Sequence, residues 1–201
     1  FPLPKMIVFC AFTFDPEAAK EKWRGHLKRV ARTAFYQAIA YAGTDRRAQR
    51  AIVKAELDRL TADFFRAVSF EEGETPQYQE IYGLFIDAGL LVKNSASAPE
   101  ISTVSQFIEP RQALVRSGEL TRFREVELCE STEIFGNVAH RFNSYAKSGT
   151  VKGVSFAARG MISTQFVQTP AGWKISAMAW DDERPGLSIL EQYEPSASDR
   201  G

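Results

Sequence analysis

The chain has 201 residues, of which 44% are hydrophobic and 12% aromatic, enough for one well-packed domain of ordinary size. Basic and acidic side chains number 25 each, which argues against nucleic-acid binding, because contacts with phosphates need a basic surplus. No apolar run approaches the roughly 18 residues that a membrane-spanning helix needs, so no membrane partner is expected. Cys10 and Cys129 fit neither a metal site nor a disulfide framework. We therefore expect no cofactor and a reducing, cytoplasmic location.

Two helices are predicted first along the chain. Over residues 15–42, apolar positions from Trp23 to Ala42 recur at spacings of three and four, while lysines and arginines cover the other faces. Gly43-Thr44-Asp45 should end this basic helix and cap a second one. The second helix carries a longer apolar stripe: Ile52, Val53, Leu57, Leu60, Phe64, Phe65 and Val68. We therefore treat residues 1–44 as an N-terminal extension and residues 45–190 as the main domain.

Shorter elements are expected next. Tyr78, Ile81, Tyr82 and Phe85 would share one side of a short third helix. Residues 89–93 are typical of a short buried strand, and residues 94–99 are rich in turn-forming types. Ser102 or Thr103 would then cap a fourth helix. Pro110 falls inside the apolar stripe of that helix, so we expect a kink or a break there.

The remaining chain is predicted to form an antiparallel meander. Turn-forming residues at 136–137, 147–149 and 169–172 separate four candidate strands, at 121–135, 137–147, 154–168 and 173–182. In the last strand both faces carry apolar groups, with Trp173 and Ile175 on one and Met178 and Trp180 on the other. We therefore expect a second subunit to cover one face in a homodimer. The alternative is that the N-terminal helix covers this face within one chain. Residues 191–201 are expected to form a flexible tail.

Three segments carry a resemblance to a known superfamily. They are Ala62-Asp63-Phe64-Phe65, the segment Tyr82-Gly83-Leu84-Phe85-Ile86-Asp87-Ala88, and Thr169-Pro170-Ala171-Gly172-Trp173-Lys174-Ile175. Together with the order of elements, they resemble the nuclear transport factor 2-like (NTF2-like) superfamily, which includes ketosteroid isomerases and SnoaL-like polyketide cyclases. The resemblance covers about residues 50–190. It implies an α+β cone in which helices pack on a curved antiparallel sheet around a pocket, with the basic helix as an addition.

The polar groups that a ketosteroid isomerase uses are not matched. The resemblance places Phe64 where those enzymes have a tyrosine, and Val92 or Lys93 where they have the carboxylate base. The position of their protonated aspartate falls on Ile162 or Ser163. An oxyanion hole without donors stabilises no charge, so steroid isomerisation by that mechanism is not expected.

Two other residues are candidates for acid–base chemistry. His140 shares a strand face with Val138 and Phe142, and the resemblance points this face into the cone, where an imidazole could transfer protons. Lys93 could act as a base or form a Schiff base if it is buried. Alternatively, His140 is a core histidine held by one hydrogen bond, and a shift of one residue turns Lys93 to solvent.

A small apolar or amphipathic molecule is the expected ligand of the pocket, and the sequence leaves three functions open. The first is a binding protein with an apolar pocket. The second is an isomerase–dehydratase or SnoaL-type enzyme that uses His140, with or without Lys93. The third is a dimerisation or interaction module, which a filled cone would favour. The ligand wall in the first two cases would consist of Phe64, Tyr82, Phe142, Ile162, Met178 and Trp180.

Overall fold

A computed structural model describes residues 28, 30, 46–95 and 97–195 of the chain. Contacts divide the chain into two units, Phe1–Gln49 and Arg50–Gly201. In the first unit, Lys28 and Val30 are helical, whereas the rest of the basic helix predicted over residues 15–42 lies outside the described residues. The second unit contains the sheet, the core and the candidate site.

Three helices of the second unit supply one wall of its core. Residues 50–68 are helical and bury the predicted stripe from Leu57 to Val68, although Ile52 at its start is 63% exposed. The short helix α2 (Tyr78–Leu84) follows, and α3 (Val104–Arg116) comes after the first two strands. Of the two predicted caps, Ser102 and Thr103, it is Thr103 that caps α3. It forms a capping box, because the Gln106 N–H donates to its hydroxyl over 3.3 Å and its own N–H donates to the Gln106 side chain over 2.9 Å.

A kink or a break was expected at Pro110, and α3 continues through this residue without a break. Proline lacks the N–H that would reach the carbonyl one turn earlier, and its ring disturbs the preceding turn. The Arg111 guanidinium donates to the carbonyl oxygen of Phe107 over 2.7 Å, so a side chain supplies a hydrogen bond within this turn.

Six strands form one mixed sheet in the order β2-β1-β6-β5-β4-β3. All neighbouring pairs are antiparallel except β1 and β6, which are parallel. The meander predicted from turn chemistry is present, and β2, which the sequence analysis assigned to no strand, precedes α3. The strands are β1 (Phe85–Lys93), β2 (Glu100–Thr103), β3 (Leu120–Phe135), β4 (Val138–Val151), β5 (Val154–Thr169) and β6 (Gly172–Asp182).

The turn between β4 and β5 lies later than predicted. Residues 147–149 continue β4, and the chain reverses at Lys152 and Gly153, whose φ angles are +52° and +76°. Gly149 serves close packing instead of a turn. A Cβ there would lie 2.6 Å from the carbonyl oxygen of Arg122 and 2.7 Å from the ring of Phe156. Glycine is thus required where a neighbouring strand and a ring approach the backbone.

A β-bulge explains why both faces of the last strand looked apolar in the sequence. Phe166 of β5 pairs with Ile175, but its neighbour Gln165 pairs with Ala177, so Ser176 is an extra residue in β6. Because of this extra residue, the side chains after Ser176 point to the opposite face from the one that strict two-residue alternation predicts. Consequently Trp173, Ile175, Met178 and Trp180 all contribute to the same core. The homodimer was predicted because both faces of this strand looked apolar. The bulge removes that reason, and the homodimer stays a prediction.

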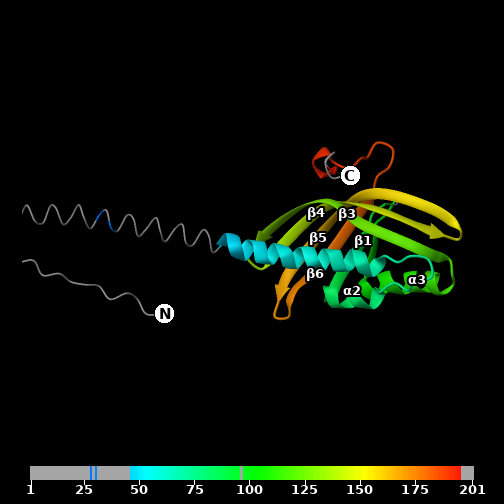
Figure 1. The fold of residues 1–201 in the computed structure, drawn as a ribbon, viewed down its shortest axis with the longest axis horizontal. Coiled ribbons are helices and arrows are strands. Elements are labelled where there is room, and N and C mark those ends of the chain that lie inside the picture. Colours follow the sequence, from blue (N-terminus) through cyan, green and yellow to red (C-terminus); the bar gives the residue numbers. More distant parts are fainter. Residues whose placement is uncertain (1–27, 29, 31–45, 96, 196–201) are drawn as a thin grey trace, which may run out of the picture. The chain divides into compact units, whose positions relative to one another are not determined.

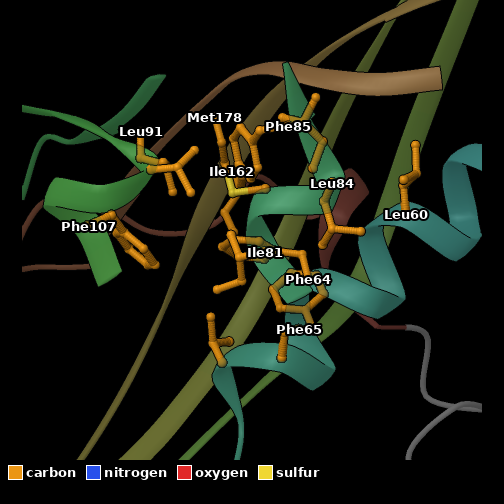
Figure 2. Close-up of a cluster of buried hydrophobic side chains, with 14 of the residues drawn as sticks. Leu60, Phe64, Phe65, Ile81, Leu84, Phe85, Leu91, Phe107, Ile162 and Met178 are labelled. Atoms are coloured by element: carbon orange, nitrogen blue, oxygen red, sulfur yellow. The ribbon is translucent and has the colours of Figure 1, made fainter. Parts of the chain in front are cut away.

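The core lies between the helices and this face of the sheet. In Figure 2, Phe64 and Phe65 come from the helix over residues 50–68, and Ile81 and Leu84 come from α2. They pack against side chains of the sheet, among them Met178. In Figure 1 the three helices lie on one side of the sheet of this unit and the C-terminal segment, in red, lies on the other.

The first residues of the predicted flexible tail are packed against the sheet. Glu191–Tyr193 form a 3-10 helix, and Tyr193 is buried, with its carbonyl oxygen accepting from the Ser144 hydroxyl over 2.6 Å. The ring of Tyr193 meets that of Phe142 edge-on, with the centroids 5.3 Å apart. The expected tail from Glu191 is therefore wrong for these residues, because an aromatic contact and a hydrogen bond hold them to β4.

Candidate active site

A cavity of about 370 Å³ lies between the helices and the sheet of the second unit. Most of its wall is apolar, and several of these side chains appear together in Figure 2. Five polar side chains interrupt this wall: Tyr78, Lys93, Arg111, Glu125 and Lys147. An apolar cavity with a few convergent polar groups is the usual form of a small-molecule site. The aromatic part of the wall consists of Phe64, Phe107, Phe123, Phe156 and Trp180.

Glu125 is the only carboxylate among the described residues that line this cavity. It lies on β3, and its backbone N–H donates to the Ser69 hydroxyl over 3.0 Å. This bond fixes the strand beside the end of the helix over residues 50–68. Burial raises its pKa to about 7, Asp182 acts in the same direction, and Lys147 and Arg111 oppose the shift. Glu125 can therefore both accept and release a proton near neutral pH.

Lys147 lies directly opposite Glu125 in the pairing of β3 with β4. Its ammonium donates to both carboxylate oxygens of Asp182, at 2.6 and 2.9 Å. Asp182 also accepts from the hydroxyl of Tyr145, whose pKa is raised by burial and by this hydrogen bond. The ammonium is thus held in a fixed position at the cavity wall by two neighbouring side chains.

Gly160 allows this network to span three strands. Gly160 on β5 pairs with Tyr145 on one side and Asp182 on the other. A Cβ at this position would lie 2.6 Å from the Tyr145 hydroxyl oxygen. The tyrosine side chain therefore crosses the space that a side chain at position 160 would occupy.

Arg111 and Tyr78 bring further polar atoms to the helical side of the cavity. The guanidinium of Arg111 stacks on the ring of Phe107, 3.6 Å from its centroid, and burial lowers its pKa. Burial raises the pKa of Tyr78 to about 12, so its hydroxyl stays protonated at neutral pH. It can donate a hydrogen bond but carries no charge there.

Five of the residues named from the sequence line the cavity, namely Phe64, Lys93, Ile162, Met178 and Trp180. Three do not. Tyr82 is 43% exposed on α2. His140 and Phe142 lie on the opposite face of the sheet, where His140 Nε2 is 3.1 Å from the Ser163 hydroxyl and Phe142 contacts Tyr193. His140 is thus held by a hydrogen bond outside the cavity, which corrects its placement in the cone.

The interior face of β4 misled the sequence argument because it is polar. Arg141, only 1% exposed, forms ion pairs with Asp58, with Glu127 at 3.1 Å and with Glu130 at 3.7 Å. Its neighbour Asn143 is also buried. The two-residue alternation was correct, but the assumption that the more apolar face points inward was wrong for this strand.

The sequence analysis missed Glu125, Lys147 and Arg111. Lys147 was assigned to a turn, and Arg111 follows the proline at which the helix was expected to bend or end. The sequence does contain one indication of Glu125. It lies two residues after Phe123, so the two side chains share a strand face, and a carboxylate beside an aromatic ring on one face suggests a site. The pairing of Glu125 with Lys147 depends on strand register, which the misplaced turn concealed.

The described part of the chain has neither a metal-binding cluster nor a membrane-spanning helix. No group of three or more His, Cys, Asp or Glu side chains within residues 46–95 and 97–195 is placed to hold a metal ion. Over the same residues, no helix is both long and apolar enough to span a membrane.

Comparisons with known proteins identify the fold. No protein-family model and no curated protein matches the sequence. An NTF2-like superfamily protein from Salmonella enterica serovar Typhimurium is similar in structure, with a TM-score of 0.55 at 13% identity over 71% of this chain and 98% of that chain. An NTF2-like protein with a cystatin-like fold from Novosphingobium aromaticivorans has a TM-score of 0.53 at 16% identity, over 77% and 90% of the two chains.

A third similar structure has a name that refers to a reaction. It is from Novosphingobium aromaticivorans and is provisionally assigned as a scytalone dehydratase, with a TM-score of 0.55 at 8% identity over 75% of this chain and 97% of that chain. At such identities the similarity establishes architecture alone. The second unit of this protein therefore has the α+β fold of the NTF2-like superfamily, as the resemblance predicted.

Proposed function

We propose that the cavity binds a small amphipathic molecule and that Glu125 transfers a proton within it, as in an isomerase or a dehydratase. The observation that carries this proposal is a carboxyl group in an apolar cavity, with its pKa raised to about 7 and a fixed ammonium on the neighbouring strand. A general acid or base works best when its pKa lies close to the working pH. Glu125 takes the role that the sequence analysis gave to His140.

In the proposed reaction, the Glu125 carboxylate removes a proton from a carbon next to a carbonyl group. The C–H electron pair moves toward the carbonyl oxygen, and the Lys147 ammonium stabilises the negative charge that develops there. In a dehydration, the C–O bond at the β-carbon then breaks as the carbon–carbon double bond forms. Protonated Glu125 returns its proton to the departing hydroxyl, so that water leaves and the carboxylate is regenerated.

Two observations favour this reading over the alternatives. An interaction module would be expected to have a filled interior, whereas this one holds a cavity of about 370 Å³. A binding protein without catalysis would gain nothing from a carboxyl group that desolvation keeps near half-protonation at neutral pH. The provisional assignment of one similar structure as a dehydratase is consistent with the proposal but, at 8% identity, adds only the fold.

The proposal is tested by titrating Glu125 and by following one reaction. Carbon-13 NMR of the labelled side chain should give a pKa for Glu125 of about 7. The aldol adduct of benzaldehyde and acetone serves as the probe, because its dehydration produces a conjugated enone that absorbs in the ultraviolet. Glu125→Gln should lower the rate at least about 100-fold, the usual scale of general-base catalysis.

Glu133→Gln is the matched control, because Glu133 is an exposed glutamate on the same strand. It should keep the wild-type rate. A Glu125 carboxyl that titrates at its ordinary value would refute the acid–base role. Equal rates for Glu125→Gln and wild type would refute it as well.

A further inference from the structure

Arg111 is a cation at the cavity wall without a matching anion. No carboxylate of the described residues lies within ion-pair distance of its guanidinium, which donates to the carbonyl oxygen of Phe107 and stacks on the Phe107 ring. Glu125 and Glu100 oppose the lowering of its pKa by burial, but from beyond that distance. The contrast with Arg141 is informative, because that buried arginine forms ion pairs with three carboxylates. A desolvated charge is costly unless a partner compensates it. The burial that lowers the pKa of Arg111 expresses the same cost.

Lys93 adds a second positive charge to the same cavity. It lies at the end of β1, opposite Trp180 of β6, and both side chains line the cavity. Within the described chain, Lys93 forms no ion pair, whereas Lys147 is compensated by Asp182. Against Arg111 and Lys93 the wall offers only Glu125, which is about half protonated at neutral pH. The side chains that line the cavity therefore carry an excess of positive charge.

The apolar part of the wall beside Arg111 indicates what accompanies the missing anion. Phe107 packs edge-on against Trp180, with ring centroids 6.1 Å apart, and its ring is tilted against that of Phe64, with centroids 6.3 Å apart. All three rings line the cavity. Nη2 and Nε of Arg111 have no hydrogen-bond partner among the described residues, so the planar group keeps donors for a bidentate acceptor.

We propose that the ligand of this cavity is a small aromatic or alicyclic carboxylate, whose carboxylate is bound by Arg111 with Lys93 in support. Its ring packs against Phe107 and Trp180, and its reactive carbon lies toward Glu125 and Lys147. This inference rests on the proposed function for the cavity's role as a ligand site, and it adds the substrate class. The positive charge that the fold leaves uncompensated is compensated by the ligand.

The test compares two probes that differ in charge and hardly in shape, naphthoate and naphthamide. Isothermal titration calorimetry should show that the wild-type protein binds naphthoate at least about tenfold more tightly, as expected for a charge-assisted pair. Arg111→Gln should remove this preference and leave naphthamide binding unchanged. Arg116→Gln, at the exposed end of the same helix, should keep the preference.

Lys93→Met provides a second variant, because Arg111 also supports the turn of α3 around Pro110. It should reduce the preference for naphthoate by a smaller factor and leave the helix intact. Equal binding of the two probes by the wild type would overturn the inference. So would a preference that survives both substitutions, or the absence of naphthoate binding at millimolar concentration.

This binding experiment can be separated from the test of the proposed function, because it needs no turnover. Glu125→Gln should keep or strengthen naphthoate binding, since it removes a negative charge from the cavity. If Glu125 titrates normally while the preference depends on Arg111, the acid–base role fails and the carboxylate ligand stands. If the preference is absent while Glu125 titrates near 7, the ligand class alone is wrong.

Discussion

At position 160 a missing side chain is what allows Tyr145 to reach Asp182. We predict that Gly160→Ala destabilises the protein by about 1–3 kcal/mol, the usual cost of placing an extra carbon in a packed interior. The added Cβ would overlap the backbone carbonyl oxygen of Asp181 on the neighbouring strand and would lie 2.6 Å from the Tyr145 hydroxyl oxygen, so both β6 and the bond from Tyr145 to Asp182 would be disturbed. Urea unfolding measures the loss.

Gly83→Ala is the control for this prediction. Gly83 lies in α2, has no atom within 4 Å of the position of an added Cβ, and has no positive φ angle. Alanine there should be neutral or slightly stabilising, because it favours the helix. If both variants unfold alike, the close approach at Gly160 does not matter.

The buried carboxyl of Glu125 predicts a pH dependence of stability. Burial raises its pKa from the usual 4.5 to about 7, so folding favours the protonated form. Its contribution to stability is therefore complete below about pH 4.5 and is lost as the pH rises through 7. Glu125→Gln, which cannot ionise, should be more stable than wild type at about pH 8.5 by up to roughly 3 kcal/mol.

The advantage of Glu125→Gln should shrink as the pH falls and should vanish near pH 4.5. Urea unfolding at several pH values checks this course, and Glu133→Gln should show no such trend. An advantage that is constant with pH would indicate that Glu125 does not titrate differently in the folded and unfolded states.

Among the elements, the 3-10 helix near the C-terminus has the most specific packing on the outer face of the sheet. Tyr193→Ala removes the ring that meets Phe142 and should destabilise the protein by about 2 kcal/mol. The naphthoate affinity should not change, because Tyr193 and the cavity lie on opposite faces of the sheet. Thermal unfolding and calorimetry measure the two effects, and Gln192→Ala, at an exposed neighbour, is the control.

The strands show which parts of the fold a sequence can predict. Strong turn signals such as Gly136-Asn137 and the segment 169–172 placed the ends of β3, β5 and β6 within one or two residues. The turn at Lys152 and Gly153 was missed because Gly149 gave a competing signal whose real cause is close packing. The bulge at Ser176 was invisible, since it depends on the partner strand.

At the scale of the whole second unit, the two faces of the sheet have separate roles. The helical face encloses the cavity, and the outer face carries His140, Phe142 and the C-terminal segment. The sequence predicted the fold, because period and resemblance determine the order of elements and the core. Four of the six residues expected in the ligand wall, together with Lys93, line the cavity. It could not predict the polar part of the cavity, since strand register and helix packing decide that Glu125, Lys147 and Arg111 line the same cavity.

This division predicts that His140→Ala behaves as the loss of a structural histidine, not of an acid–base group in the cavity. Loss of the contact with Ser163 should cost at most about 1 kcal/mol of stability, as for one partly exposed hydrogen bond. Naphthoate affinity and the dehydration rate should stay at wild-type values, as calorimetry and the ultraviolet assay can show. A large loss of naphthoate binding would contradict this prediction and would indicate that His140 contacts the ligand.

The position of β3 at the sheet edge has a consequence for amide hydrogen exchange. One side of this strand pairs with β4, and the other meets Phe70, through its bridge to Phe123, and the hydroxyl of Ser69 beside Glu125. Strand edges with few such bonds open more readily than the centre of a sheet. A molecule that contacts Glu125 on β3 and Arg111 on α3 would join this edge to a helix, and the protection of both segments from deuterium would rise together.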